Sequence, residues 1–148
     1  MNPPKIIDTD YINFIIATPR QITATEGKDT NFTAKLVEVR PDGYARIIES
    51  RIRRGRSLES EGVSNTLMRG HVYKFEIEMG ATAIKLQKGS SLWLEVSSSN
   101  FLKYDCNPNT GENPLKATVF KTVKQTVFHS AGYPSQVILP VLKEDSVK

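Results

Sequence analysis

Residues that could do chemistry gather in one polar stretch of the chain, residues 97–112 (SSSNFLKYDCNPNTGE). Oxygen-bearing side chains alternate in it at Asp105, Asn107, Asn109 and Glu112. Such side chains are ligands that Ca²⁺ prefers, but their spacing differs from an EF-hand loop and Pro108 interrupts it. The alternative is an ordered turn in which Asn and Asp side chains bond to nearby backbone groups. We favour the turn and assign no metal ligand.

Nucleophilic catalysis would need a serine or cysteine beside a histidine and an orienting acid. The sequence has no G-x-S-x-G, the motif that exposes a serine on a strand-turn-helix elbow in α/β-hydrolases. His71 opens an apolar stretch and His129 ends one, and nothing in the sequence pairs either of them with a nucleophile. We therefore assign no catalytic residue and no cofactor-binding residue.

The composition is that of one soluble globular domain. The chain has 148 residues, of which 39% are hydrophobic and 24% are charged, enough to bury a core. No apolar run approaches the roughly 20 residues of a membrane span, and the N-terminus lacks the pattern of a signal peptide. The single cysteine, Cys106, cannot form an internal disulfide. We expect a cytoplasmic protein that does not bind membranes.

The net charge of +4 is modest, and one dense basic cluster stands out. It consists of Arg51, Arg53, Arg54 and Arg56. Such a cluster could contact phosphates, but no aromatic residues alternate with it to stack on bases. We interpret it as a solvated or interface-facing strand end and expect no nucleic-acid partner.

Short β-branched and aromatic runs between turn signals predict an all-β fold of antiparallel sheets. The clearest feature is a hairpin, in which 31–39 and 44–50 flank the turn Arg40-Pro41-Asp42-Gly43. Further strands are predicted at 11–17, 21–25, 72–79, within 80–89, and at 91–97, 117–119, 121–129 and 136–142. We place a flexible lead-in at 1–10, the domain at 11–142 and a tail at 143–148.

Alternation within two of these strands predicts their buried faces. In 72–79 the inward side chains are Tyr73, Phe75, Ile77 and Met79. In 91–97 they are Leu92, Leu94 and Val96, with Trp93 and Glu95 on the opposite face. We expect Trp93 to pack between layers rather than to form a ligand platform.

Three segments, in this order, resemble the C-terminal domain of the X-Pro dipeptidyl-peptidase and CocE/NonD family of serine hydrolases, which includes cocaine esterases and acylases. They are residues 29–43 (DTNFTAKLVEVRPDG), 92–112 (LWLEVSSSNFLKYDCNPNTGE) and 124–141 (KQTVFHSAGYPSQVILPV). The resemblance extends from about residue 28 to residue 142. It implies a jelly-roll-like β-sandwich of the galactose-binding-like type, and it makes the arginine cluster a family feature.

The resemblance implies a function without catalysis, because the catalytic triad of that family lies in a preceding domain. The chain would support an α/β-hydrolase domain or subunit, shape access to its active site and contribute to assembly. We expect the domain interface at Asn100, Phe101, Tyr104, Asp105, Asn107, Asn109 and His129. The alternative is a stand-alone carbohydrate-binding module, with Tyr44, Trp93, Tyr104 and Tyr133 as the aromatic candidates.

The N-terminal part departs from the family pattern. Pro19 falls where a central strand should run, and proline cannot donate a hydrogen bond to the ladder. An incomplete sandwich would expose a strand edge or an apolar patch. We therefore expect the chain to form a homo-oligomer.

Overall fold

The structure is a computed structural model that describes residues 6–9, 13–17, 28–57, 66–68, 70–128 and 130–139. Its strands are β1 (Ile6–Thr9), β2 (Asn13–Ala17), β3 (Asn31–Val39), β4 (Ala45–Arg54), β5 (Lys74–Glu78), β6 (Thr82–Lys85), β7 (Ser91–Ser97) and β8 (Gln136–Ile138). A single turn of 3-10 helix, η1, spans Gly55–Ser57. Within these ranges no helix is long and apolar enough to cross a lipid bilayer.

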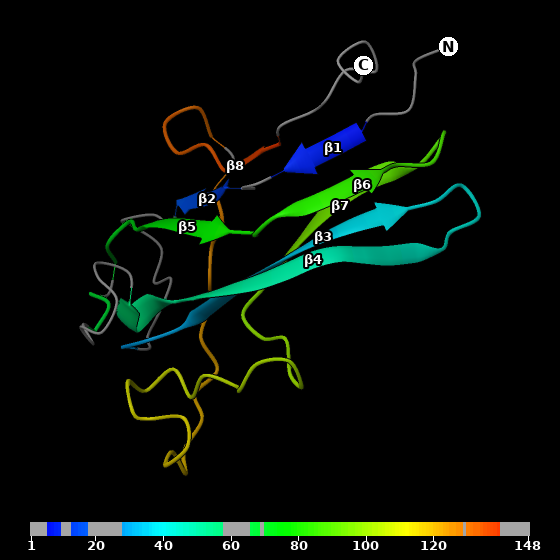
Figure 1. Cartoon of the computed structure of the whole chain (residues 1–148). Coiled ribbons are helices and arrows are strands. Elements are labelled where there is room, and N and C mark those ends of the chain that lie inside the picture. The colour runs from blue at the N-terminus through cyan, green and yellow to red at the C-terminus, as the bar shows by residue number, and fades with distance from the viewer. Residues whose placement is uncertain are drawn as a thin grey trace.

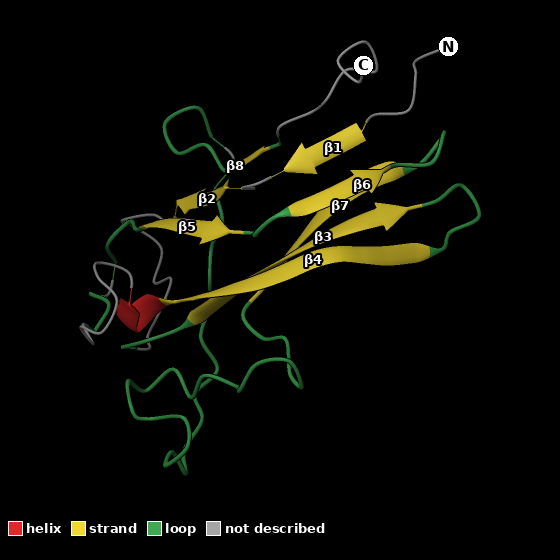
Figure 2. Ribbon diagram, in the orientation of Figure 1, coloured by secondary structure: helices red, strands yellow, loops and turns green. Residues whose placement is uncertain are grey.

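The strands form two layers (Figure 1), and every pairing between them is antiparallel. One layer is the sheet β4-β3-β7, and the other combines the sheet β5-β2-β8 with the pair β1-β6. Long irregular segments, drawn in green in Figure 2, lie on the far side of β4-β3-β7 from the second layer. The predicted all-β, antiparallel fold is therefore confirmed, and its arrangement is that of a β-sandwich.

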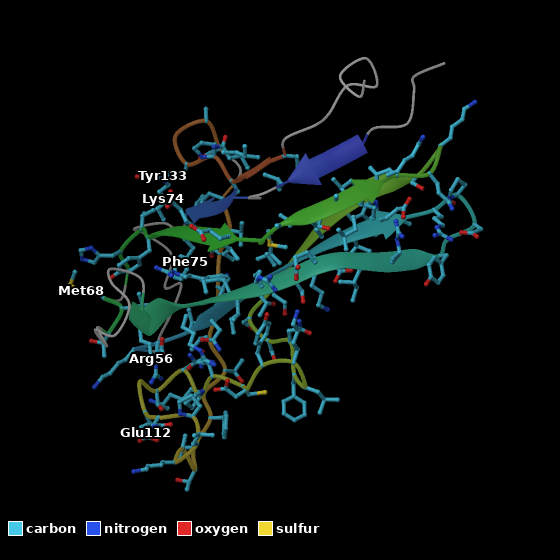
Figure 3. The ribbon with its side chains drawn as sticks, in the orientation of Figure 1. Arg56, Met68, Lys74, Phe75, Glu112 and Tyr133 are labelled. Atoms are coloured by element: carbon cyan, nitrogen blue, oxygen red, sulfur yellow. The ribbon has the colours of Figure 1, made fainter. Side chains whose placement is uncertain are left out.

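The core lies between the two layers. Its buried members are Phe32, Ala34, Leu36, Phe75, Ile77 and Met79. They come from β3 and from β5 with the residue after it, and the Phe32 and Phe75 rings meet edge to face with their centroids 4.6 Å apart. Figure 3 shows the Phe75 side chain between the layers. The predicted inward face of residues 72–79 is confirmed for Phe75, Ile77 and Met79.

The predicted hairpin forms between β3 and β4. Its turn closes through bonds from Arg40 N to the Tyr44 carbonyl and from Gly43 N to the Arg40 carbonyl, both 2.9 Å long. Gly43 has φ of +86°, a left-handed conformation that favours glycine. The return strand continues to Arg54, beyond the predicted end at Ser50, and a bulge between Leu36 and Val37 shifts the register of the pair.

Two strand predictions, at 117–119 and 121–129, are wrong for the residues that the structure describes. Residues 117–128 form no strand, because their bonds run to loops instead of to a neighbouring strand. For example, Lys121 N donates to the Pro108 carbonyl at 3.0 Å. The last strand, β8, covers only three residues of the predicted 136–142, of which 140–142 lie outside the described residues.

Two further expectations differ from the structure. Ile6–Thr9, which we placed in a flexible lead-in, pairs with β6 as a strand, since its β-branched residues favour extended backbone. Trp93 does not pack between layers but is 56% exposed. Predictions on residues 18–27, which include Pro19 and the strand at 21–25, lie outside the described residues, as do His129 and the tail at 143–148.

Candidate functional site

The signature loop, defined as residues 98–112, follows β7 and hangs below the β4-β3-β7 sheet in Figure 1. It turns immediately, with Tyr104 N donating to the Asn100 carbonyl at 3.0 Å. Asn109 has φ of +60° and Gly111 has φ of +87°, conformations that Asn tolerates and Gly adopts freely. The polar residues of this stretch therefore build a shaped loop, as the turn interpretation predicts.

A buried polar knot, made of Asp29, Asn31, Arg56 and Asn107, ties this loop to the sheet. The Asn107 amide nitrogen donates to Asp29 Oδ2 and to Asn31 Oδ1, each at 2.9 Å. Arg56 donates to Asp29 Oδ2 through Nε at 2.7 Å and lies 2.6 Å from it through Nη2. Asp29 is 1% exposed and also accepts two backbone N–H bonds at Oδ1. A buried carboxylate is stabilised only with such partners.

Asn109 connects the loop to the segment of residues 117–128. Its backbone N–H donates to Asn107 Oδ1 at 2.8 Å, and its side-chain amide donates to the Lys121 carbonyl at 2.8 Å. Further along, the Gln125 amide donates to the Thr30 hydroxyl. These bonds explain why 117–128 runs as an extended connection without joining a sheet.

Within the cluster, Arg51, Arg54 and Arg56 form ion pairs with acidic side chains. Arg54 makes a bidentate pair with Asp105, and the guanidinium holds the pKa of the Asp105 carboxyl below its ordinary value. Arg51 lies 2.9 Å from Glu49, while Arg56 pairs with Asp29 and also donates to the Glu112 carbonyl at 2.9 Å. Figure 3 shows Arg56 above Glu112 at the end of the sheet. Arg54 of β4 and Arg56 of η1 thus fix the loop to these two elements.

A second attachment fixes the loop to the middle of β4. Lys103 Nζ donates to the Ser50 carbonyl at 2.9 Å and contacts its hydroxyl at 2.7 Å. The Tyr104 hydroxyl donates to the same carbonyl at 3.1 Å. Within the described sheet β4 is an edge strand, so these contacts occupy a polar group that could otherwise pair with another strand.

The structure gathers the six described residues of the expected interface on this one loop. Asn107 is buried, Asn100, Tyr104 and Asn109 are half-buried, and Phe101 and Asp105 are exposed. Sequence reasoning missed the partners of Asn107. Two of them, Asp29 and Asn31, lie just before β3 and at its first residue, within the segment 29–43 that resembles the family. It also missed the exposed side chains of Leu102, Leu115, Val119 and Phe120.

The oxygen-bearing residues of the loop contact protein groups instead of converging on a common point. Asp105 pairs with Arg54, and Asn107 and Asn109 make the bonds given above. Among the residues that the structure describes, no group of three or more His, Cys, Asp or Glu side chains is placed to hold a metal ion.

The aromatic candidates of the carbohydrate-binding alternative contact different neighbours. Arg40 stacks on Tyr44, with 4.9 Å from its guanidinium carbon to the ring centroid. Lys103 lies over Tyr104, and Tyr133 contacts Phe128 with ring centroids 5.9 Å apart. These contacts do not assemble an aromatic-lined face.

Comparison with known proteins agrees with this arrangement, a β-sandwich with a loop that buried hydrogen bonds hold against it. The family model described as the X-Pro dipeptidyl-peptidase C-terminal non-catalytic domain matches residues 19–138. The chain is 33% identical to the cocaine esterase of Rhodococcus sp. (strain MB1 Bresler) over 144 residues, which cover 90% of this chain and 25% of that protein.

Solved structures give the same result for the fold. An aminopeptidase from a marine sediment Thaumarchaeota archaeon superposes with a TM-score of 0.85 at 24% identity, covering 97% of this chain and 24% of that one. An α-amino acid ester hydrolase superposes with a TM-score of 0.78 at 25% identity, covering 96% and 24%.

The fold and the loop define a β-sandwich domain whose polar signature residues serve its architecture. The chain belongs to the family of X-Pro dipeptidyl-peptidase C-terminal non-catalytic domains. It spans about a quarter of the length of the relatives that it matches.

Proposed function

We propose that this chain is the supporting domain of a CocE/NonD-type serine hydrolase, and that its partner is the catalytic α/β-hydrolase domain or subunit. It performs no bond cleavage itself. Its role is to stabilise the catalytic domain and to shape access to the active site, with the signature loop at the interface. The cytoplasmic location and the homo-oligomer stay predictions from the sequence.

One observation carries this proposal: a loop held by buried polar bonds presents large apolar side chains to solvent. Asp29, Arg56 and Asn107 fix the base of the loop, while Phe101 is 69% and Leu102 is 86% exposed at its tip. Exposed apolar side chains on a rigid scaffold are typical of interaction surfaces. The family description as non-catalytic supports the same role.

A chimera tests the proposal. This chain replaces the matching quarter of the Rhodococcus cocaine esterase, and the comparison protein is the same enzyme with that quarter deleted. We expect the chimera to hydrolyse an ester substrate and to melt at a higher temperature than the deletion protein. A chimera with no more activity and no higher melting temperature than the deletion protein would contradict the proposal.

A further inference from the structure

An apolar row crosses the outer face of the β4-β3-β7 sheet. Val37 lies directly opposite Trp93 in β7 and Ile47 in β4, and residues opposite one another in antiparallel strands share a face. This face points away from the core, because Leu36 and its partner Leu94 belong to the core side. Val37 is nevertheless only 2% exposed, whereas Trp93 and Ile47 are 56% and 58% exposed. Trp93 and Ile47 thus lie on either side of the buried Val37 and are themselves exposed to solvent.

The signature loop attaches to β4 close to this row. Lys35, two residues before Val37 on the same face, is paired with Ser50 in β4, and Ser50 is where Lys103 and Tyr104 attach the loop. The exposed residues just before them, Phe101 and Leu102, belong to the same loop. We call Ile47 and Trp93, which flank Val37, the apolar surface. The charged pair next to the row is Lys35 and Glu95, 3.7 Å apart.

We propose that the apolar surface is the face on which the catalytic domain of the hydrolase docks. This inference rests on the proposed function and names the residues that carry it. The outer face of a two-layer sandwich is ordinarily polar, since it meets water. The exposed tryptophan and isoleucine on that face instead fit a partner that is apolar opposite them, and large aromatic anchors carry much of the binding energy at interfaces.

The occupant follows from the length of the relatives and from the charge of the surface. About three quarters of the cocaine esterase and of the α-amino acid ester hydrolase lies outside the matched region, and a neighbouring part of that size is the occupant that we infer for an exposed apolar face of this fold. Interfaces between domains of one chain bury about 600–1,500 Å². The neighbouring Lys35 and Glu95 neutralise one another, so the surface offers no net charge to an ionic partner.

The test uses the chimera and two matched substitutions, Trp93→Ser on the apolar surface and Leu115→Ser outside it. Both side chains are exposed in this chain, so we expect both variants to keep the melting temperature of the isolated chain. In the chimera we expect Trp93→Ser to lower the melting temperature and the ester turnover clearly, and Leu115→Ser to change neither. Ile47→Ser repeats the first variant with a smaller side chain and should act in the same direction.

A fluorescence measurement gives an independent readout, because Trp93 is the only tryptophan of the chain. Acrylamide should quench it strongly in the isolated chain at every concentration. If the chimera is active but Trp93→Ser and Leu115→Ser behave alike, the apolar surface is not the docking face and the proposed function stands. An inactive chimera would reject the proposed function itself. Quenching that weakens as the isolated chain is concentrated would mean that a second copy covers the surface, which overturns the inference.

Discussion

At the scale of single residues, the signature loop owes its composition to buried hydrogen bonds. Asn107 is the central residue, since its amide group joins Asp29 and Asn31 at the start of β3 to the backbone of Asn109. Arg56 completes the knot by neutralising the buried carboxylate of Asp29. The Asn-Pro-Asn-Thr-Gly motif suggests a ligand site in the sequence, but in the fold its two asparagine side chains bond to other groups of the protein.

Asn107→Ala tests the knot. The variant loses three side-chain bonds and leaves the Asp29 and Asn31 oxygens short of a donor, so the free energy of unfolding should fall by about 2–3 kcal/mol. Asn113→Ala is the matched control, because Asn113 is exposed and its side-chain oxygen accepts a local bond from Leu115 N at 3.0 Å. Urea denaturation of both variants measures the difference, and equal losses would contradict a structural role for the knot.

A second buried carboxylate belongs to Glu38, which is fully buried on the core-facing side of β3. The backbone N–H of Gln87 donates to it at 2.9 Å, and Arg46 Nη2 lies 2.7 Å from it. The bond from Gln87 is the largest cause that lowers the pKa of the Glu38 carboxyl, ahead of the contributions of Ser90 and Arg46, and together they outweigh the opposing effect of burial.

Glu38 should therefore contribute stability that depends on pH. Because its folded-state pKa is lowered, the contribution is complete above the ordinary pKa of about 4.5 and is lost as the pH falls through the folded value. Glu38→Gln should cost about 2–3 kcal/mol at pH 7 and should flatten the loss of stability between neutral pH and acid. Melting temperatures across that range measure it, and unchanged acid dependence would count against this role.

At the scale of elements, the β3–β4 hairpin and the signature loop act as one unit. The loop residues Lys103, Tyr104 and Asp105 attach to β4 at Ser50 and Arg54. The hairpin depends in turn on Gly43, whose positive φ closes the turn. A substitution that distorts the turn should therefore also weaken the attachment of the loop, because the loop is attached to β4.

Gly43→Ala isolates the backbone effect of the turn. No atom would lie within 4 Å of the new methyl group, so its cost comes from the left-handed φ alone and should be about 1–2 kcal/mol. Gly132→Ala is the control, because it also has open space and carries no positive φ in the left-handed range. Thermal unfolding compares the two, and a Gly43→Ala variant as stable as the control would refute the argument.

The sequence predicts those elements whose side chains alternate between a buried and an exposed face. Strands β5 and β7 lie within or at their predicted bounds for this reason, whereas β3, which also lies at its predicted bounds, is buried along nearly its whole length. Periodicity also places Trp93 opposite Leu92 and Leu94, but it does not reveal whether another layer covers that face. The residues at 117–128 have strand-like composition, yet their bonds to Asn109 and Thr30 depend on tertiary structure.

The site was predictable only as a segment. A local pattern identifies 98–112 as an ordered polar turn, and the resemblance adds that it characterises a family. The partnership of Asn107 with Asp29 joins residues 78 positions apart, a separation at which a single sequence carries no pairing signal. The exposed side chain of Leu102 was missed because apolar residues are ordinarily assigned to the core.

At the scale of the whole molecule, the domain presents an inner core between two layers and an apolar surface on its outer sheet. An exposed apolar surface promotes aggregation of an isolated domain, whereas beside a catalytic domain it can be buried in an interface. Family membership and the proposed docking face lead to the same account, in which this chain supports catalysis that takes place elsewhere.

The most direct test of that account is the hydrolysis of a nitrophenyl ester and an Xaa-Pro anilide by the purified chain, with parallel labelling by a serine-reactive fluorophosphonate. The account predicts no turnover and no label on the chain, while the active chimera is labelled and hydrolyses the ester. Stoichiometric labelling of the isolated chain together with turnover would show that it carries its own nucleophile, and would contradict a purely supporting role.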